Sequence, residues 1–299
     1  LDGNAFGNTF TAVEIPFCTI ENGNTVTRAT NFTLLHDTNN SGNYVIVFRG
    51  VGDITGCSIW GSTRMQYGTG WLSTSYYDAV TKSPNPIFTA ETANKIVYAI
   101  ADHGITKLGG QMFANTKIET FVYPETLENI NNSFSNAYVK TVFRAGTSKD
   151  YIEDGLYDLH YENLKIEGMS LNGNNNVKKI HLPTNFKSIT SYGVFNQLTK
   201  LERIWCSDTF DTGTAGILDF SGATELASIG TEAFINTAGA PAKTLRLPDS
   251  CTNISSDIFV QNGQENKCSI TRVEQVTRND SVAAVCEAGG IEYVNGNFN

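Results

Sequence analysis

Charged residues are scarce in this chain of 299 residues. They make up 17% of the sequence, whereas about a quarter is usual for globular proteins. Acidic residues outnumber basic ones by 30 to 21, which gives a formal net charge of −9. Because nucleic acids and anionic membranes attract basic surfaces, this balance argues against both as general partners. A run of 18 apolar residues is also lacking, so the sequence predicts no membrane-spanning helix.

Cysteine and histidine are too few and too scattered to organise a fold or a metal centre. The six cysteines include no CxxC pair, and the four histidines share no metal-ligand spacing. The GxSxG, HExxH and GxxxxGK motifs are absent as well. The sequence therefore predicts no metal ion, no cofactor and no catalytic constellation.

Uncharged polar residues and internal repetition are abundant instead. The chain contains 30 asparagines and 27 glycines, and three of its segments align: Ile118–Ile130, Val177–Ile189 and Ala242–Ile254. Each has a strand-like apolar triplet followed directly by proline. Each also has an isoleucine nine positions after the strand centre, and then a phenylalanine at a short offset.

Weaker copies of this pattern fill the gaps between the three segments. The strand centres are all apolar, and they are Phe121, Val142, Leu164, Ile180, Ile204, Leu218, Leu245 and Val273. The seven steps from the first to the last average about 22 residues, inside the period of leucine-rich repeats. One such unit cannot bury its apolar face alone, so the pattern predicts stacked units that form a solenoid with a parallel sheet.

The pattern I/L-x-x-I-x-L-P, with its second apolar residue and following phenylalanine, resembles the BspA-like leucine-rich repeat family of bacterial surface proteins. The resemblance covers residues 91–276, and Tyr44–Asp53 is similar to the Gly-rich strand that precedes such arrays. Arg144 and Gln275 depart from it where an inward leucine is expected. Asp211–Gly216 and Ala238–Ala240 look inserted. The resemblance implies a right-handed, mostly β superhelix in a secreted or surface-anchored bacterial protein, whose role is adhesion to host matrix proteins or other cells.

The flanks of the array predict two caps, which divide the chain into residues 1–90, 91–276 and 277–299. Residues 1–90 read as β-structure, because Asn22-Gly23 signals a hairpin and Tyr44–Phe48 is a dense strand. In residues 277–299, Asp280-Ser281 is expected to cap a helix that Gly289 ends. The chain starts at Leu1 with neither a methionine nor a signal peptide, so an export signal would already have been removed.

Three short motifs suggest chemistry but have simpler interpretations. Asp37–Gly42 is similar to the start of a calcium loop, yet Phe48 stands where an EF-hand needs glutamate, which favours an Asx-rich hairpin. Gly50–Gly56 has one glycine too late for a dinucleotide loop and favours a turn that leaves a strand. Asp102-His103 is followed by Gly104 and favours a solvated turn over a catalytic pair.

The repeat register also predicts the surroundings of two cysteines. Cys206 takes the inward position that Leu182 and Leu247 fill, and Cys251 takes the position of Leu127 and Phe186. Both are therefore predicted to be buried, reduced thiols that pack like small hydrophobic residues. The register leaves open the disulfide state of the other four cysteines: Cys18, Cys57, Cys268 and Cys286.

Between the two inward residues of each strand lies an outward residue, and this column holds the candidate binding site. It contains Phe143, His181, Trp205 and Arg246, and Arg203 stands in the neighbouring outward column. We expect these five side chains to form an exposed ladder, because exposed aromatic residues beside arginine are typical of interface hot spots. The alternative is that an insertion or polar neighbours cover Trp205.

The sequence therefore favours a binding scaffold over an enzyme, with a host matrix protein or another cell-surface protein as partner. One alternative is a glycan-binding protein in which Trp71, Tyr76, Tyr77 and Trp205 stack on sugar rings. Another is an enzyme whose site lies in the first 90 residues. Anchoring, oligomeric state and the ligand itself stay open.

Overall fold

A computed structural model describes most of the repeat array and parts of the N-terminal region. The described residues are 10–14, 21–22, 25–26, 31–37, 42–53, 77–78, 83–84, 90–109, 112–114, 116–130, 132–161, 166, 170–189, 193–210, 214–241, 243–259 and 268–298. The chain divides into two compact units, Leu1–Gly146 and Thr147–Asn299. None of the helices in these ranges is long and apolar enough to cross a membrane.

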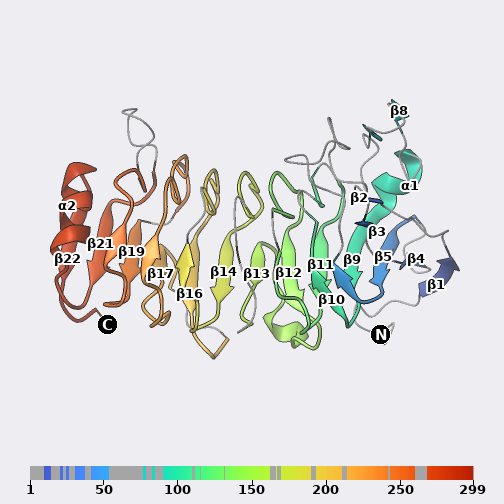
Figure 1. Ribbon diagram of the computed structural model, residues 1–299, viewed down its shortest axis with the longest axis horizontal. Coiled ribbons are helices and arrows are strands. Elements are labelled where there is room, and N and C mark those ends of the chain that lie inside the picture. The colour runs from blue at the N-terminus through green and yellow to red at the C-terminus, as the bar shows by residue number, and fades with distance from the viewer. Residues whose placement is uncertain are drawn as a thin grey trace. The chain divides into compact units, whose positions relative to one another are not determined.

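The first unit joins an antiparallel sheet to the start of a parallel one (Figure 1). The antiparallel strands are β1 (Phe10–Glu14), β4 (Asn31–Asp37) and β5 (Tyr44–Arg49). The parallel strands β9 (Ile96–Ala101), β11 (Thr120–Tyr123) and β12 (Thr141–Arg144) follow β5 in that order. Shorter elements are the hairpin β2 (Glu21–Asn22) and β3 (Thr25–Val26), the pair β6 (Gly52–Asp53) and β10 (Ile105–Lys107), the hairpin β7 (Tyr77–Asp78) and β8 (Ser83–Pro84), and α1 (Ala90–Lys95). The predicted N-terminal β-cap is confirmed.

The second unit is a parallel solenoid that ends in one helix and one further strand (Figure 1). Its main sheet contains β13 (Leu156–Asp158), β14 (Lys179–Leu182), β16 (Arg203–Cys206), β17 (Ile217–Asp219), β19 (Thr244–Leu247), β21 (Arg272–Gln275) and β22 (Glu292–Asn295). A smaller parallel sheet contains β15 (Ser188–Ile189), β18 (Ser228–Ile229) and β20 (Asn253–Ile254). The 3-10 helix η1 (Lys149–Tyr151) precedes β13, and α2 (Asp280–Ala288) lies between β21 and β22.

The strand centres form one continuous row in the core of this unit. Ile180 pairs with Ile204, Ile204 with Leu218, Leu218 with Leu245, and Leu245 with Val273. All five are buried, as the register predicts. Two of the phenylalanines that close repeats stack on each other: the Phe195 and Phe234 centroids lie 5.4 Å apart with an interplanar angle of 11°. Matching positions therefore meet in register, so each repeat buries its neighbour's apolar face.

One predicted strand is wrong. Leu164 was expected at a strand centre, but the strand before β14 is β13, whose Tyr157 pairs with Ile180. Leu164 itself lies outside the described residues. Tyr157 is fully buried, and its hydroxyl accepts a hydrogen bond of 2.6 Å from the Asn174 side chain. A buried tyrosine hydroxyl needs such a hydrogen-bond partner. The aliphatic residues at the other strand centres do not predict a tyrosine at this position.

The C-terminal helix is confirmed, but its cap is one residue earlier than expected. The side chain of Asn279 accepts a hydrogen bond from the Val282 backbone N–H, so it caps α2 in place of Asp280-Ser281. Gly289 ends the helix as predicted. The helix does not complete the unit, because β22 follows it and pairs with β21.

The two residues that replace an expected inward leucine differ in their burial. Arg144, at the end of β12, is exposed. Gln275 is buried, and its amide donates hydrogen bonds to the carbonyl oxygens of Pro248 and Cys251. Its side-chain oxygen accepts a bond from the Tyr293 hydroxyl. We call Gln275, Tyr293 and these two carbonyls the glutamine clasp, which joins the preceding turn to the last strand.

The sequence analysis interpreted three short motifs as turns: Asp37–Gly42, Gly50–Gly56 and Asp102–Gly104. Those of their residues that the structure describes agree with this interpretation. Asp102 and His103 lie between β9 and β10; the Asp102 carboxylate pairs with Arg49, and His103 is largely exposed. Gly50 and Gly52 adopt positive φ where the chain leaves β5. Most of Asp37–Gly42 lies outside the described residues. Among all the residues that the structure describes, no three His, Cys, Asp or Glu side chains lie close enough together to hold a metal ion.

Truncating a side chain in the buried row of strand centres should lower the stability of the protein measurably. We expect Ile180→Ala and Leu245→Ala each to lower the free energy of unfolding by about 2–5 kcal/mol, because each leaves a cavity in a packed row. Chemical denaturation measures the change. Lys187→Ala, at a side chain that is 71% exposed, is the control and should change stability by less than about 0.5 kcal/mol. An equally small loss for Ile180→Ala would contradict the register.

The cysteines give a second prediction, since Cys206, Cys251 and Cys286 are free and buried. Burial raises the pKa of the Cys251 and Cys286 thiols to about 12 and raises that of Cys206 further. Near pH 8 their thiolates are suppressed, so a thiol reagent should label none of them in native protein and all three after denaturation. Peptide mapping by mass spectrometry measures this. A disulfide at Cys206 or Cys251 would refute it.

Candidate functional site

The outward residues of the second unit form a ladder across its main sheet. The register places His181 beside Trp205, and it places Arg246 between Asp219 and Glu274. Arg203 lies two residues before Trp205 on β16, so both side chains leave the same face of the strand. Four of the five predicted site residues therefore share this face. The fifth, Phe143, belongs to the first unit.

Aromatic rings stack along the first part of this ladder. The His160 and His181 rings are nearly parallel, with centroids 4.4 Å apart, and the His181 and Trp205 centroids lie 4.8 Å apart. Phe210 meets both His181 and Trp205 edge-on, and the Tyr151 ring packs on Phe210 at 4.3 Å. We call His160, His181, Trp205, Phe210 and Tyr151 the stacked cluster.

The expected exposure of the aromatic residues is wrong. Trp205 is only 3% exposed and His181 only 1%, and Phe143 in the first unit is buried as well. The reason in the second unit is Phe210, which follows β16 and borders the inserted residues 211–216. The strand alternation itself holds. The structure supports the alternative in which Trp205 is covered, but the covering ring is Phe210, which precedes the insertion; residues 211–213 lie outside the described residues.

Polar and charged groups also contact the stacked cluster. The His181 Nδ1 atom lies 3.1 Å from an oxygen of the Asp158 carboxylate, and its Nε2 atom lies 3.0 Å from the carbonyl oxygen of Ser207. The Arg203 guanidinium lies 5.0 Å from the centre of the indole of Trp205, a cation–π distance. The buried indole Nε1 has no hydrogen-bond partner within the described part of the chain.

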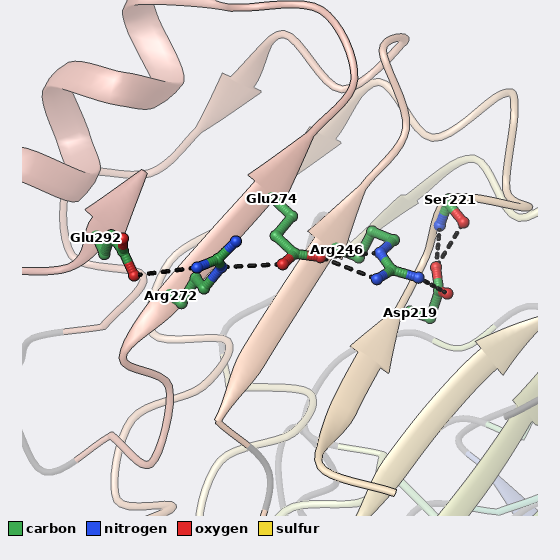
Figure 2. A network of polar contacts seen from close by, with 6 residues as sticks. All are labelled: Asp219, Ser221, Arg246, Arg272, Glu274 and Glu292. Carbon is green, nitrogen blue, oxygen red and sulfur yellow. Dashed lines mark hydrogen bonds and ion pairs between the residues drawn. The ribbon is translucent and has the colours of Figure 1, made fainter. Parts of the chain in front are cut away.

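Charged residues continue the ladder towards the C-terminal strand, as Figure 2 shows. Arg246 donates to the Asp219 carboxylate and, through two nitrogens, to one oxygen of Glu274, at 2.9–3.1 Å. Arg272 donates to the other oxygen of Glu274 and lies 3.5 Å from Glu292. We call these five side chains the charge ladder. Opposite charges alternate along it, so every in-register neighbour is attractive.

The sequence reasoning missed three residues of the stacked cluster and one that orients it: Tyr151, His160, Phe210 and Asp158. The first three lie outside strands, and periodicity assigns faces only within strands. The one available signal was Phe210 itself, an aromatic residue directly before an insertion and five residues after Trp205.

The geometry favours binding over catalysis within the described residues. A histidine paired with a buried aspartate is typical of a general base. However, both ring nitrogens of His181 already have partners, and the ring is almost completely buried. It therefore presents no nitrogen to a substrate. Of the residues expected to stack on sugar, Trp71 and Tyr76 lie outside the described part, and Tyr77 begins β7.

The parallel turns of about 22 residues, each with an inward aliphatic row and a closing phenylalanine, define a leucine-rich repeat solenoid. Comparison with known families agrees: residues 73–142, 159–214 and 207–283 match the BspA type leucine rich repeat region, in six copies. The chain belongs to this family. Solenoids of this kind are typically non-catalytic binding scaffolds, and family members are often surface proteins.

Two solved structures are similar to this chain, and both are bacterial leucine-rich repeat proteins. One, from Eubacterium ventriosum, is 13% identical, with a TM-score of 0.38, and the match covers 88% of this chain and 73% of that one. The other, from Bacteroides ovatus, is 14% identical, with a TM-score of 0.36, and the match covers 91% and 71%. No curated protein matches the chain.

The cover over Trp205 can be tested directly. Phe210→Ala should expose the indole, because it removes the ring that meets Trp205 edge-on. We expect a red-shifted Trp205 emission and stronger acrylamide quenching, measured as the difference from the Trp205→Phe variant. Tyr138→Ala, which removes an exposed ring in the first unit, is the control and should leave the emission unchanged. Unchanged quenching in Phe210→Ala would mean that another group covers Trp205.

Proposed function

We propose that this chain is a non-catalytic binding protein of the bacterial surface, secreted or anchored, that recognises a host matrix protein or another cell-surface protein. The proposed binding face is the outer face of the second unit, comprising the stacked cluster, Arg203 and the charge ladder. It contains four of the residues that the sequence singled out: His181, Arg203, Trp205 and Arg246.

The observation that carries this proposal is that the core does not need these side chains. Inward residues alone fill the solenoid, while the outer face carries stacked rings and three arginines. Aromatic residues and arginine dominate the energetics of protein interfaces. Tyr151, exposed at 46%, and the half-exposed Arg272 present these groups to solvent.

The buried members of the face support the exposed ones. Trp205 holds Arg203 at cation–π distance, and Phe210 holds the Tyr151 ring. Substituting Trp205 itself would disturb packing as well as binding, so the exposed residues are the better probes. Glycan binding is the alternative, in which the exposed ring of Tyr151 would stack on a sugar.

The test uses the variants Tyr151→Ala and Arg272→Ala, alone and combined, and measures their binding to a panel of immobilised matrix proteins. For the partner that the wild type binds, we expect each substitution to weaken the affinity by about 1 kcal/mol or more, roughly fivefold, with the melting temperature nearly unchanged. Lys187→Ala is the matched control, because Lys187 also forms a surface ion pair, with Glu225.

The same variants on a glycan array separate the two partner classes. Binding to glycans that Tyr151→Ala abolishes would replace the protein partner by a sugar. Undiminished protein binding by the double variant would move the site away from this face.

A further inference from the structure

Strand β22 lies at one end of the main sheet, in contact with α2 (Figure 1). Within the part of the chain that the structure describes, β22 pairs in parallel with β21 and with no other strand. The backbone N–H groups of Glu292 and Gly296 donate to carbonyl oxygens on the β21 side. Because backbone groups alternate in direction along a strand, those of Tyr293 and Asn295 point to the opposite edge. This edge therefore offers two donors and two acceptors to a further strand.

The residues that follow β22 turn away from this edge. Gly296 adopts a positive φ of 144°, and the ring of Phe298 then lies 5.6 Å from the guanidinium of Arg246 on β19. In the sheet order, β19 and β22 lie on opposite sides of β21. The chain therefore folds back over the outer face of the sheet, and these residues leave the edge of β22 open.

The outer side of α2 is also unusual for the end of a solenoid. The residues on the side away from its three buried residues are small or apolar, and they are exposed or half-exposed: Ser281, Ala284, Val285 and Ala288. The capping element of a repeat protein needs a polar outer face to remain soluble. Small side chains on this side instead allow another helix to approach closely.

The edge of β22 complements a second copy of itself. In an antiparallel pair centred on Val294, Tyr293 of each copy exchanges both backbone hydrogen bonds with Asn295 of the other copy. Within β22, a register centred on either of those two residues pairs only that residue with itself. In the register centred on Val294, Glu292 faces Gly296. The two glutamates then lie about 14 Å apart, beyond the Debye length of about 8 Å at physiological salt.

We propose that two copies of this chain associate through β22 and α2 about a two-fold axis beside Val294, so that the main sheet continues from one copy into the other. The strands set the register. The helices supply apolar contact, because a few backbone bonds do not offset the freedom lost on association. The outward column that contains Asp219, Arg246 and Glu274 continues to Val294, so two valines meet at the axis in place of two like charges. This inference does not rest on the proposed function.

Cysteine cross-linking tests the register. Val294→Cys places two thiols in a non-hydrogen-bonded antiparallel pair, whose Cα atoms lie about 4.5 Å apart, within reach of a disulfide. Glu292→Cys is the matched control, because position 292 faces position 296 of the other copy and is too far from its own equivalent. With oxidised glutathione, we expect covalent dimers of Val294→Cys, linked at position 294 by peptide mapping, and no link at position 292 in the control.

Sedimentation equilibrium tests association without a cross-link. Because a small interface binds weakly, the wild type is measured from about 10 µM to 1 mM, and its mass should rise from one chain towards two. Val294→Lys should weaken association by about tenfold or more, because two ammonium groups meet at the axis. Within one chain the new side chain lies beside Glu274, which attracts it. Val276→Lys adds the same charge at an exposed valine away from the axis, and it should associate like the wild type.

The outcomes that overturn the inference are distinct. A single-chain mass at every concentration would leave the edge to a strand of another protein. Dimers that persist in Val294→Lys, or cross-linking that is equal or absent in the two cysteine variants, would place the contact between copies elsewhere. Circular dichroism checks that each variant folds. If Val294→Lys does not fold, the cross-linking pair decides alone.

Discussion

In-register stacking of identical positions is the constraint on which the second unit depends. The strand centre of each repeat is covered by the strand centres on either side, from Ile180 to Val273, because a single turn is too thin to enclose an apolar side chain. The same constraint aligns the closing phenylalanines, so Phe195 stacks on Phe234. Stability is thus a property of neighbouring turns more than of any one turn.

Stacking has a further effect on the outer face, where it brings outward residues as close together as inward ones. Adjacent strands lie about 4.8 Å apart, so an outward column must consist of mutually compatible groups. Two solutions occur side by side: flat rings stack from His160 to Trp205, and opposite charges alternate from Asp219 to Glu292. The binding face is therefore shaped by the requirements of the sheet as well as by those of a partner.

Much of this fold could be predicted from the sequence because periodicity reports on burial within strands. Ile180, Leu245, Cys206 and Cys251 are buried where the register put them. The predictions that were wrong concern contacts made by residues between strands. Leu164 was predicted as a strand centre, whereas the strand before β14 is centred on Tyr157, whose buried hydroxyl is paired with Asn174, 17 residues away.

The candidate site was predicted less completely for the same reason. The register identified the outward face and the adjacency of His181, Trp205 and Arg203. It could not identify the cover, because Phe210 reaches Trp205 from a turn whose path no repeat pattern fixes. The contacts of the His181 ring with Asp158 and Ser207 join residues that converge only in three dimensions.

The glutamine clasp has a consequence for how such an array can lengthen. Repeat proteins gain turns by duplication, and a new turn is accepted where it offers its neighbours the same surfaces as the old ones. Gln275 breaks that equivalence. Its amide donates to the carbonyl oxygens of Pro248 and Cys251 in the preceding turn, and its side-chain oxygen accepts from Tyr293 of the last strand. A turn inserted between β21 and β22 would leave a buried polar group unpaired. Growth is therefore confined to positions before β19, because the turns of β19, β21 and β22 are joined by the clasp.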